Sequence, residues 1–187
     1  MPEPVRIGIV GAESTGKTTL ATDLASRLVQ DTGLRVAWVP ELLREWCDRA
    51  GRTPLAHEQA ALLQAQHERI EAAAAMHDVV VCDTTALMTA VYSRMVFNDR
   101  SLDERAIALH SRMALTLLTA LDLPWVADGH QRDGEHVRAP VDALLRELLL
   151  AHRLPWAVIG GQGPERLERA LNAVAPLLPP ADAWRRP

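Results

Sequence analysis

The sequence predicts a three-layer α/β domain, in which a parallel five-stranded sheet is covered by helices on both faces. Three observations favour this class. Short apolar runs of strand length alternate along the chain with longer stretches of helical period, as in proteins built from parallel strands and crossover helices. Each short run stops at turn or polar residues. The 187 residues, 48% hydrophobic and 24% charged, match the size and composition of one globular domain.

Five runs have the length and the composition of strands. The expected strands cover residues 5–10, 35–39, 79–82, 115–119 and 156–159, and they stop at Gly11, at Pro40, at Asp83, near Asp122 and at Gly160. Glycine, proline and aspartate disfavour continued extended structure, so each strand has a defined end.

Five helices are expected between and after these strands. They cover residues 18–30, 57–76, 103–112, 141–152 and 164–174, where apolar residues recur at spacings of three and four. Right-handed crossovers would place them on both faces of the sheet. Residues 1–175 are therefore predicted to form a single domain, and residues 176–187 a proline-rich C-terminal tail.

Charge and cysteine content limit the classes of partner. Lysine and arginine total 20 against 24 acidic residues, so there is no basic excess for binding nucleic acid. Cys47 and Cys82 match neither a disulfide framework nor a zinc motif. No apolar run reaches the roughly 18 residues of a membrane span, and no signal-peptide pattern precedes the first strand. We expect a soluble, cytoplasmic protein that binds neither nucleic acid nor membranes.

A phosphate-binding loop follows the first expected strand directly. Glycines let such a loop wrap around phosphates, while successive amide groups at a helix N-terminus donate to their oxygens. Lys17, the only lysine of the chain, is expected to reach the β- and γ-phosphates of ATP, and Thr18 to hold Mg²⁺. A plain glycine-rich turn is the weaker alternative. The motif reads Gly11-Ala12-Glu13-Ser14-Thr15-Gly16-Lys17-Thr18, with Thr19 next.

Asp83 is the second expected metal-side group, because it ends an apolar run that would lie beside the first strand. Thr84 and Thr85 follow it, where motor-type ATPases place a glutamate, which argues against ATP hydrolysis as the reaction. The guanine-reading motif of Ras-type GTPases contains a lysine, and the only lysine lies in the phosphate loop. The pattern therefore favours a kinase over both classes.

Glu41 follows the second expected strand and is the favoured base or anchor for an acceptor hydroxyl. A carboxylate bonded to the attacking hydroxyl orients it and takes its proton late in the transfer. Arg44, one turn on if this segment is helical, would pair with Glu41 or with a phosphate. Two alternatives stay open: Glu41 and Arg44 form an exposed pair that caps a helix, or Asp83 is itself the base.

Three further features are assigned to ligands. A polar loop over residues 124–138 is expected to act as a lid, with Arg132 and Arg138 closing over the γ-phosphate, although a solvated loop would look the same. In the turn 160–164, Gln162 and Gly163 would lie against adenine, unless the turn only joins strand to helix. The aromatic residues on the expected acceptor side either pack in the core or stack on a flat ring; they are Trp38, Trp46 and Trp125.

Together these residues resemble the ribosylnicotinamide kinase domain of the NadR proteins, a family of P-loop kinases. The resemblance covers most of the chain and implies a sheet order of 2-3-1-4-5, ATP with Mg²⁺ as donor, and the 5′-hydroxyl of nicotinamide riboside as acceptor, giving nicotinamide mononucleotide. NadR proteins carry an adenylyltransferase domain ahead of the kinase; adenylyl transfer is not expected of this chain. The resemblance rests on the phosphate loop, Glu41-Leu42-Leu43-Arg44-Glu45, Cys82-Asp83-Thr84, and above all Pro124-Trp125-Val126-Ala127-Asp128-Gly129 with Arg132 downstream.

The sequence thus predicts an ATP-dependent kinase of a nucleoside-type small molecule, with nicotinamide riboside as the preferred acceptor. A kinase of another nucleoside or small alcohol and a regulatory ATP-binding switch are the alternatives. The catalytic candidates are Lys17, Glu41, Arg44, Asp83, Arg132 and Arg138, and the acceptor-binding candidates are Trp38, Glu41, Arg44, Asp83, Trp125 and Asp128.

Overall fold

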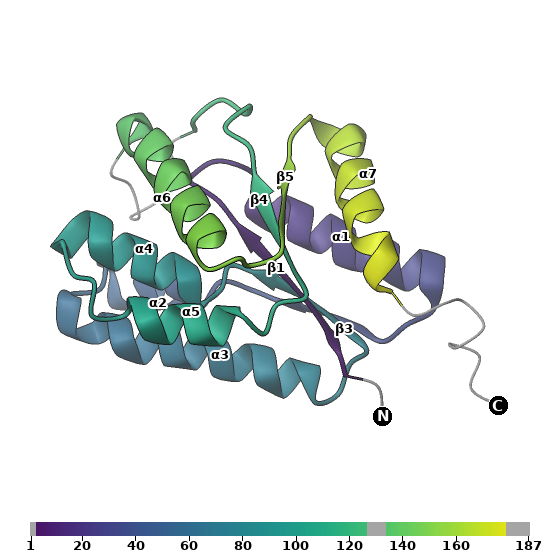
Figure 1. Ribbon diagram of the computed structural model, residues 1–187, viewed down its shortest axis with the longest axis horizontal. Helices are drawn as coiled ribbons and strands as arrows, with labels where there is room; N and C mark the ends of the chain where they lie inside the picture. Colours follow the sequence, from purple (N-terminus) through teal and green to yellow (C-terminus); the bar gives the residue numbers. More distant parts are fainter. Residues whose placement is uncertain (1–2, 127–133, 179–187) are drawn as a thin grey trace.

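A parallel sheet forms the centre of the structure, a computed structural model that describes residues 3–126 and 134–178 (Figure 1). Its order is β2-β3-β1-β4-β5, and every neighbouring pair is parallel. The predicted strand order and direction are confirmed. The strands are β1 (Val5–Val10), β2 (Val36–Val39), β3 (Val79–Asp83), β4 (Leu115–Thr119) and β5 (Trp156–Ile159).

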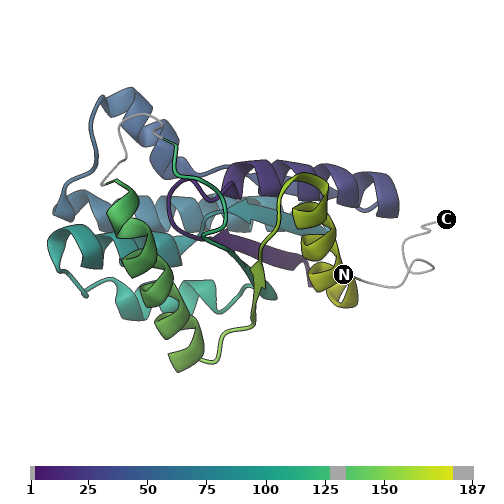
Figure 2. The ribbon, with the colours of Figure 1, turned by 90° about the horizontal axis from the view of Figure 1, so that it is seen from above.

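Helices cover both faces of the sheet, as the three-layer prediction requires (Figures 1 and 2). Within the described ranges they are α1 (Lys17–Thr32), α2 (Leu42–Ala50), α3 (Gln59–Ala74), α4 (Ala86–Phe97), α5 (Asp103–His110), α6 (Arg138–Ala151) and α7 (Gly163–Val174). α1 and α7 pack on one face, α3, α4 and α6 pack on the other, and α5 packs against α4. α2 lies beside α3.

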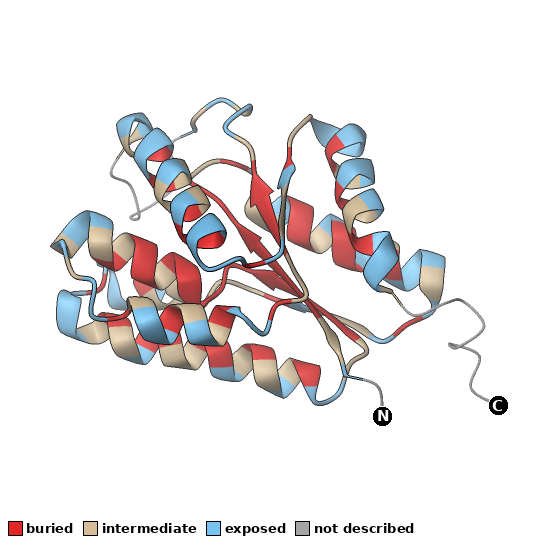
Figure 3. Ribbon diagram, in the orientation of Figure 1, coloured by how far each residue is buried: buried red, intermediate tan, exposed pale blue. Residues whose placement is uncertain are grey.

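Apolar clusters on both sides of the sheet explain why helices cover both faces. The side chains of β1 alternate between the faces: Ile7 and Ile9 join the core beneath α1 and α7, and Val10 joins the core beneath α4 and α6. Strands buried on both faces read as continuous apolar runs, as β3 does (Figure 3). The resulting rigid sheet holds the carboxyl ends of β1, β3 and β4 side by side.

Helix α4 was missed by the sequence reasoning. Its buried residues occupy almost the whole first half of the helix, so no polar face alternates with the apolar one. An amphipathic period is the signal by which a surface helix is recognised, and an evenly apolar segment lacks it. Thr85 caps the start of the helix, because its hydroxyl accepts a hydrogen bond from the N–H of Leu87.

Three remaining sequence predictions concern the surroundings and the tail. No helix of the described residues is long and apolar enough to cross a membrane. Cys47 and Cys82 are both buried and form no disulfide among the described residues, which agrees with the absence of a disulfide pattern. Residues 175–177 form a short 3-10 turn after α7, and the tail from residue 179 onward lies outside the described residues.

The buried side chain of His110 in α5 links Thr85, which follows β3, to Thr116 of β4. The ring nitrogens of His110 lie 2.8 Å from Thr85 Oγ1 and 2.7 Å from Thr116 Oγ1, and only 1% of the residue is exposed. Burial lowers the pKa of His110 to about 4. A Cβ on Gly8 would lie 2.9 Å from Thr85 Cγ2, which explains a glycine in the middle of β1.

This histidine is expected to make the folding stability depend on pH. Since the pKa of His110 is near 4 when folded and about 6.5 when unfolded, the unfolded chain takes up the proton first as the pH falls. Stability present above pH 6.5 is lost as the pH falls through 4, by up to about 3 kcal/mol. Urea unfolding at pH 7 and pH 4.5 checks this. His110→Gln should show a clearly smaller difference between the two, and an equal difference would contradict the prediction.

Candidate active site

The loop after β1 has the conformation of a phosphate-binding loop. Ser14 and Gly16 adopt positive φ angles of 54° and 73°, and Gly16 directly precedes the first residue of α1. Thr15 is fully buried; its hydroxyl donates to the carbonyl of Ala12 at 2.7 Å and lies 2.7 Å from Thr119 Oγ1. The loop is therefore fastened to the end of β4, with the N-terminus of α1 directed into it.

Lys17, Thr18 and Asp83 meet at the centre of this loop. The Lys17 ammonium donates to the carbonyl of Ala12 at 2.9 Å, so the side chain folds back over its own loop. The Thr18 hydroxyl donates to Asp83 Oδ2 at 2.5 Å. β1 and β3 are neighbours, with Ile9 opposite Asp83, and this pairing brings together residues that are 65 positions apart.

The charges around Lys17 are predominantly negative. Burial lowers the pKa of Lys17, while the nearby carboxylates of Glu41, Asp83 and Glu13 oppose that shift. Burial also raises the pKa of Asp83, against the Thr18 hydrogen bond and the charges of Lys17 and Arg44. Among the described residues, three carboxylates interact with two cations here, so this part of the site favours a further positive charge.

The residues present fit a magnesium ion. Asp83 Oδ1 is buried and has no hydrogen-bond partner among the described residues, whereas Oδ2 bonds Thr18. A hydroxyl and a carboxylate are the oxygen ligands that Mg²⁺ takes from proteins when phosphates and water complete its shell. Thr18 and Asp83 are therefore the residues of this site able to hold the metal.

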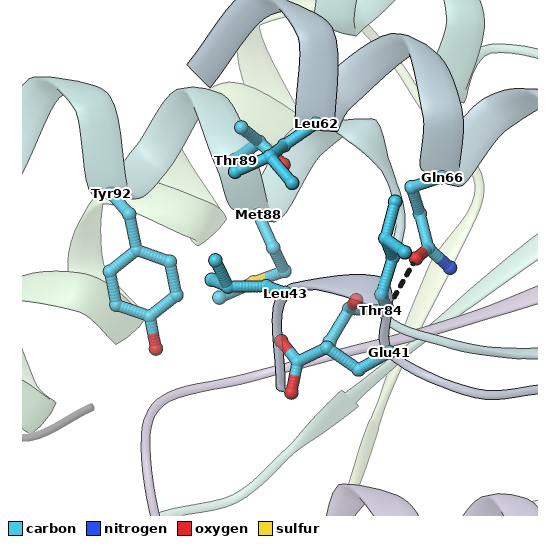
Figure 4. Close-up of a pocket in the computed structure, with 9 residues that line it drawn as sticks. Glu41, Leu43, Leu62, Gln66, Thr84, Met88, Thr89 and Tyr92 are labelled. Carbon is cyan, nitrogen blue, oxygen red and sulfur yellow. Dashed lines mark hydrogen bonds between the residues drawn. The ribbon is translucent and has the colours of Figure 1, made fainter. Parts of the chain in front are cut away.

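Glu41 lies between β2 and α2; its charge acts on Lys17, and the charge of Asp83 acts on Glu41. Burial raises the pKa of Glu41; Lys17 and Arg44 lower it, and Asp83 raises it. The carboxylate stands at one end of a pocket, next to Thr84, with Tyr92 at the other end (Figure 4). The pocket is lined by Glu41, Leu42, Leu43, Leu62, Gln66, Thr84, Met88, Thr89 and Tyr92.

Thr84, which directly follows Asp83, has a strained backbone. Its φ angle is 66°, a left-handed conformation that is unfavourable for a β-branched residue. The Thr84 N–H donates to the carbonyl of Ile9 at 3.0 Å, which continues the β1–β3 pairing past the end of the strand. Such strain is often found at functional sites, and here it turns the chain between Asp83 and the pocket.

The turn between β5 and α7 is tied to the phosphate loop. Arg166 of α7 is 5% exposed and donates to Asp122 at 2.8 Å, to the Gly161 carbonyl at 2.9 Å and to the Thr15 carbonyl at 2.7 Å. Asp122 also accepts from the Gly161 N–H at 2.6 Å. Gln162 and Gly163 are exposed at the start of α7, on the side of this junction. The sequence reasoning missed Asp122 and Arg166, since nothing local links residues 44 positions apart.

Some of the remaining candidate site residues lie near the phosphate loop or the pocket, and others do not. Trp38 is 41% exposed on the edge strand β2 and does not line the pocket. Arg138 is buried at the start of α6, where it donates to the Leu123 carbonyl at 2.8 Å. Ser14 donates to the Val126 carbonyl at 2.8 Å, so the loop after β4 reaches the phosphate loop. Asp128 and Arg132 lie outside the described residues.

The three tryptophans do not form one aromatic cluster on the pocket. Trp46 of α2 lies beneath the Arg52 guanidinium, which is 4.9 Å from the ring centroid. Trp125 is partly buried, and its Nε1 has no hydrogen-bond partner among the described residues. Neither residue is among those that line the pocket at Glu41.

The sheet order, the loop at the end of β1 and the helices on both faces are those of the P-loop kinase fold. The chain belongs to the AAA domain family, whose model matches residues 6–166. No curated protein matches it in sequence.

Solved structures agree with this fold. A NadR protein in complex with NR is 20% identical with a TM-score of 0.75, and a NadR protein in complex with NAD and AMP-PNP is 20% identical with a TM-score of 0.73. Each match covers 93% of this chain, which spans about half the length of those chains: 50% and 49%. Thymidylate kinase from Ehrlichia chaffeensis is 16% identical with a TM-score of 0.66, and the match covers 95% of this chain and 100% of that one.

A deoxyadenosine kinase from M. mycoides, with the products dCMP and dCDP, is similar over the whole of its length as well. It is 13% identical with a TM-score of 0.63, and the match covers 93% of this chain and 100% of that one. These structures share the architecture of the described sheet and helices. Kinases that act on small nucleosides and nucleotides thus use the same arrangement of strands.

Proposed function

We propose that the protein transfers the γ-phosphoryl group of ATP to the 5′-hydroxyl of a nucleoside, with nicotinamide riboside as the acceptor. One observation carries this proposal: Lys17, the Thr18–Asp83 pair and the Glu41 carboxylate interact electrostatically at one point, where the phosphate loop meets the pocket. An in-line transfer between two oxygens requires groups that hold the phosphates on one side and a carboxylate that binds the acceptor hydroxyl on the other.

On the donor side, the phosphate loop binds and orients the triphosphate. The backbone N–H groups at the start of α1 donate to phosphate oxygens, and Lys17 leaves the Ala12 carbonyl to neutralise the β- and γ-phosphates. Thr18 and Asp83 would hold Mg²⁺, which when bound supplies positive charge that offsets the negative charge developing during transfer. Gln162 and Gly163, at the turn that Arg166 ties to the loop, would contact the adenine.

On the acceptor side, Glu41 is the base. Asp83 already accepts the Thr18 hydroxyl, which leaves Glu41 as the carboxylate that opens toward the pocket. It accepts a hydrogen bond from the 5′-hydroxyl and takes its proton as the new P–O bond forms and the bond to the β-phosphate oxygen breaks. Arg44 is exposed one turn further along α2, and its positive charge acts on Glu41 and Asp83.

The pocket encloses only about 10 Å³, which is room for one water molecule rather than for a nucleoside. This pocket would therefore hold the acceptor hydroxyl rather than the whole nucleoside. The remaining candidates would contact the acceptor and the γ-phosphate; they are Trp125, Asp128 and Arg132, which follow β4 in the sequence, and Arg138 at the start of α6.

The proposal is tested by measuring ADP release from Mg-ATP with nicotinamide riboside, other ribo- and deoxyribonucleosides and nucleoside monophosphates as acceptors. Mass spectrometry identifies the phosphorylated product, and Lys17→Ala provides the background. Turnover confined to nicotinamide riboside supports the whole proposal. Turnover with another acceptor keeps the kinase and removes the substrate assignment. ATP binding without stimulated ADP release would instead favour a regulatory ATP-binding switch.

Replacing Glu41 by glutamine is expected to lower kcat about 10² to 10³-fold, because the acceptor loses its proton acceptor. The raised pKa of Glu41 adds a pH signature: activity of the unmodified protein falls as the pH drops through that pKa, at a higher pH than an ordinary carboxyl group would give. The acidic limb of the kcat–pH profile should disappear in Glu41→Gln. A profile that keeps the limb would assign the base to Asp83.

A further inference from the structure

Helix α2 begins in an unusual way. Glu41 occupies the N-cap position, with extended backbone angles of φ −66° and ψ 113°, yet its side chain makes no capping hydrogen bond. A carboxylate at an N-cap ordinarily accepts the N–H of the second or third helical residue, because the first N–H groups of a helix have no partner within it. Another group binds the start of this helix, at the N–H of Leu42, its first residue.

That group is the side chain of Gln66, which is 4% exposed on α3. Its Oε1 accepts a hydrogen bond from the N–H of Leu42 at 2.8 Å, drawn as the dashed line in Figure 4. Its Nε2 donates to the Pro40 carbonyl at 3.3 Å. The two ends of one amide thus hold the backbone immediately before and immediately after Glu41.

We propose that Gln66 is a positioning residue: it binds the N–H of Leu42 and the carbonyl of Pro40, and so keeps the Glu41 carboxylate directed at the reacting groups. The inference rests on the proposed function, in which Glu41 accepts the proton of the acceptor. Without the Gln66 amide, the backbone on both sides of Glu41 loses its buried hydrogen bonds, and we expect the carboxylate to turn onto the N–H of Leu43 or Arg44. A carboxylate used as a helix cap no longer faces the acceptor.

The other polar link between α2 and α3 does not replace Gln66. Glu45 and Arg69 form a bidentate ion pair with N–O distances of 2.8 Å, but both side chains are more than one third exposed. Exposed pairs of this kind contribute little to stability or orientation. The hydrogen bonds of Gln66 are buried, and a buried polar group left without its partner is costly, so they fix the geometry of residue 41 more strictly.

The hydrogen bonds of Gln66 limit which residues can recognise the acceptor. Gln66 lines the pocket, but both ends of its amide are hydrogen-bonded to backbone groups. Gln66 is therefore not available to bind the acceptor. The other polar side chains that line this pocket include Glu41, Thr84 and Thr89. Acceptors should therefore be discriminated at those positions, and Gln66 variants should change kcat without reordering acceptor preference.

The test compares Gln66→Met with Gln66→Glu. Methionine keeps the volume but offers no comparable acceptor to Leu42, so kcat should fall about 10- to 100-fold while KM for Mg-ATP changes less than about threefold. Glutamate keeps an oxygen for the Leu42 N–H and should restore kcat to within about fivefold of the unmodified protein. Gln64→Met, on an outer face of the same helix, is the matched control and should leave kcat unchanged.

Crystal structures supply a readout that does not depend on turnover. In Gln66→Met the Glu41 carboxylate should lie on the N–H of Leu43 or Arg44, and in Gln66→Glu it should remain at the pocket. The proposal is overturned if Gln66→Met matches Gln64→Met in kcat, if Gln66→Glu is folded but as slow as Gln66→Met, or if Glu41 does not move. Should the chain phosphorylate none of the acceptors, the proposed function fails, and the crystal structures still decide the positioning role.

Discussion

Replacing Lys17 by alanine is expected to lower the rate of phosphoryl transfer about 10³-fold or more while the protein stays folded. Removing one preorganised charged donor from a transferring group typically costs that much, and Lys17 is the only lysine of the chain. The folded state loses one hydrogen bond, from the ammonium to the Ala12 carbonyl. ADP release from Mg-ATP measures the rate, and circular dichroism with thermal unfolding checks that the variant is folded.

Arg27→Ala is the matched control for this experiment. Arg27 lies on the same helix and carries the same charge, but its ion pairs with Asp31 and Glu168 are exposed and far along α1 from the loop. It should retain nearly full activity. Turnover of Lys17→Ala within tenfold of the unmodified protein would show that the loop does not act on the transferring phosphate, and the kinase proposal would have to be abandoned.

The strands and the phosphate loop could be predicted because their signals are local. Each strand is a short apolar run closed by a turn residue, and the loop is a contiguous motif at the end of such a run. The order of the strands came from the resemblance to the NadR kinases rather than from periodicity. Once that order is known, the pairing of β1 with β3 explains why Thr18 and Asp83 meet.

The parts that escaped prediction depend on long-range contacts or lack a pattern. Gln66 and Arg166 are ordinary helical residues in the sequence, and their roles come from the backbone groups of Leu42 and Thr15 that the fold brings to them. The exposure of Trp38 follows from strand geometry. Alternate residues of a strand face opposite sides, and its neighbour Val39 is buried, so Trp38 faces the other side of β2.

A second large effect is expected at Gly11, where the chain leaves β1. The φ angle of Gly11 is +156°, and a Cβ there would overlap Thr119 Oγ1 and lie 3.1 Å from Thr15 Oγ1. Both hydroxyls are held by the hydrogen bond that fastens the loop to β4, so neither can withdraw without breaking it. Gly11→Ala should lower the free energy of unfolding by about 2 to 4 kcal/mol, as measured by urea denaturation.

Gly33→Ala separates crowding from backbone strain in this prediction. Gly33 has a φ angle of +68° after the end of α1, but a Cβ there would meet nothing within 4 Å, so this variant should lose only about 1 kcal/mol. Equal losses in the two variants would show that Gly11 is required for its backbone angle alone. In the double variant Gly11→Ala/Thr119→Ala, removal of Thr119 Oγ1 should recover part of the loss, because the overlapping atom is gone while Thr119 Cβ, 3.3 Å away, remains.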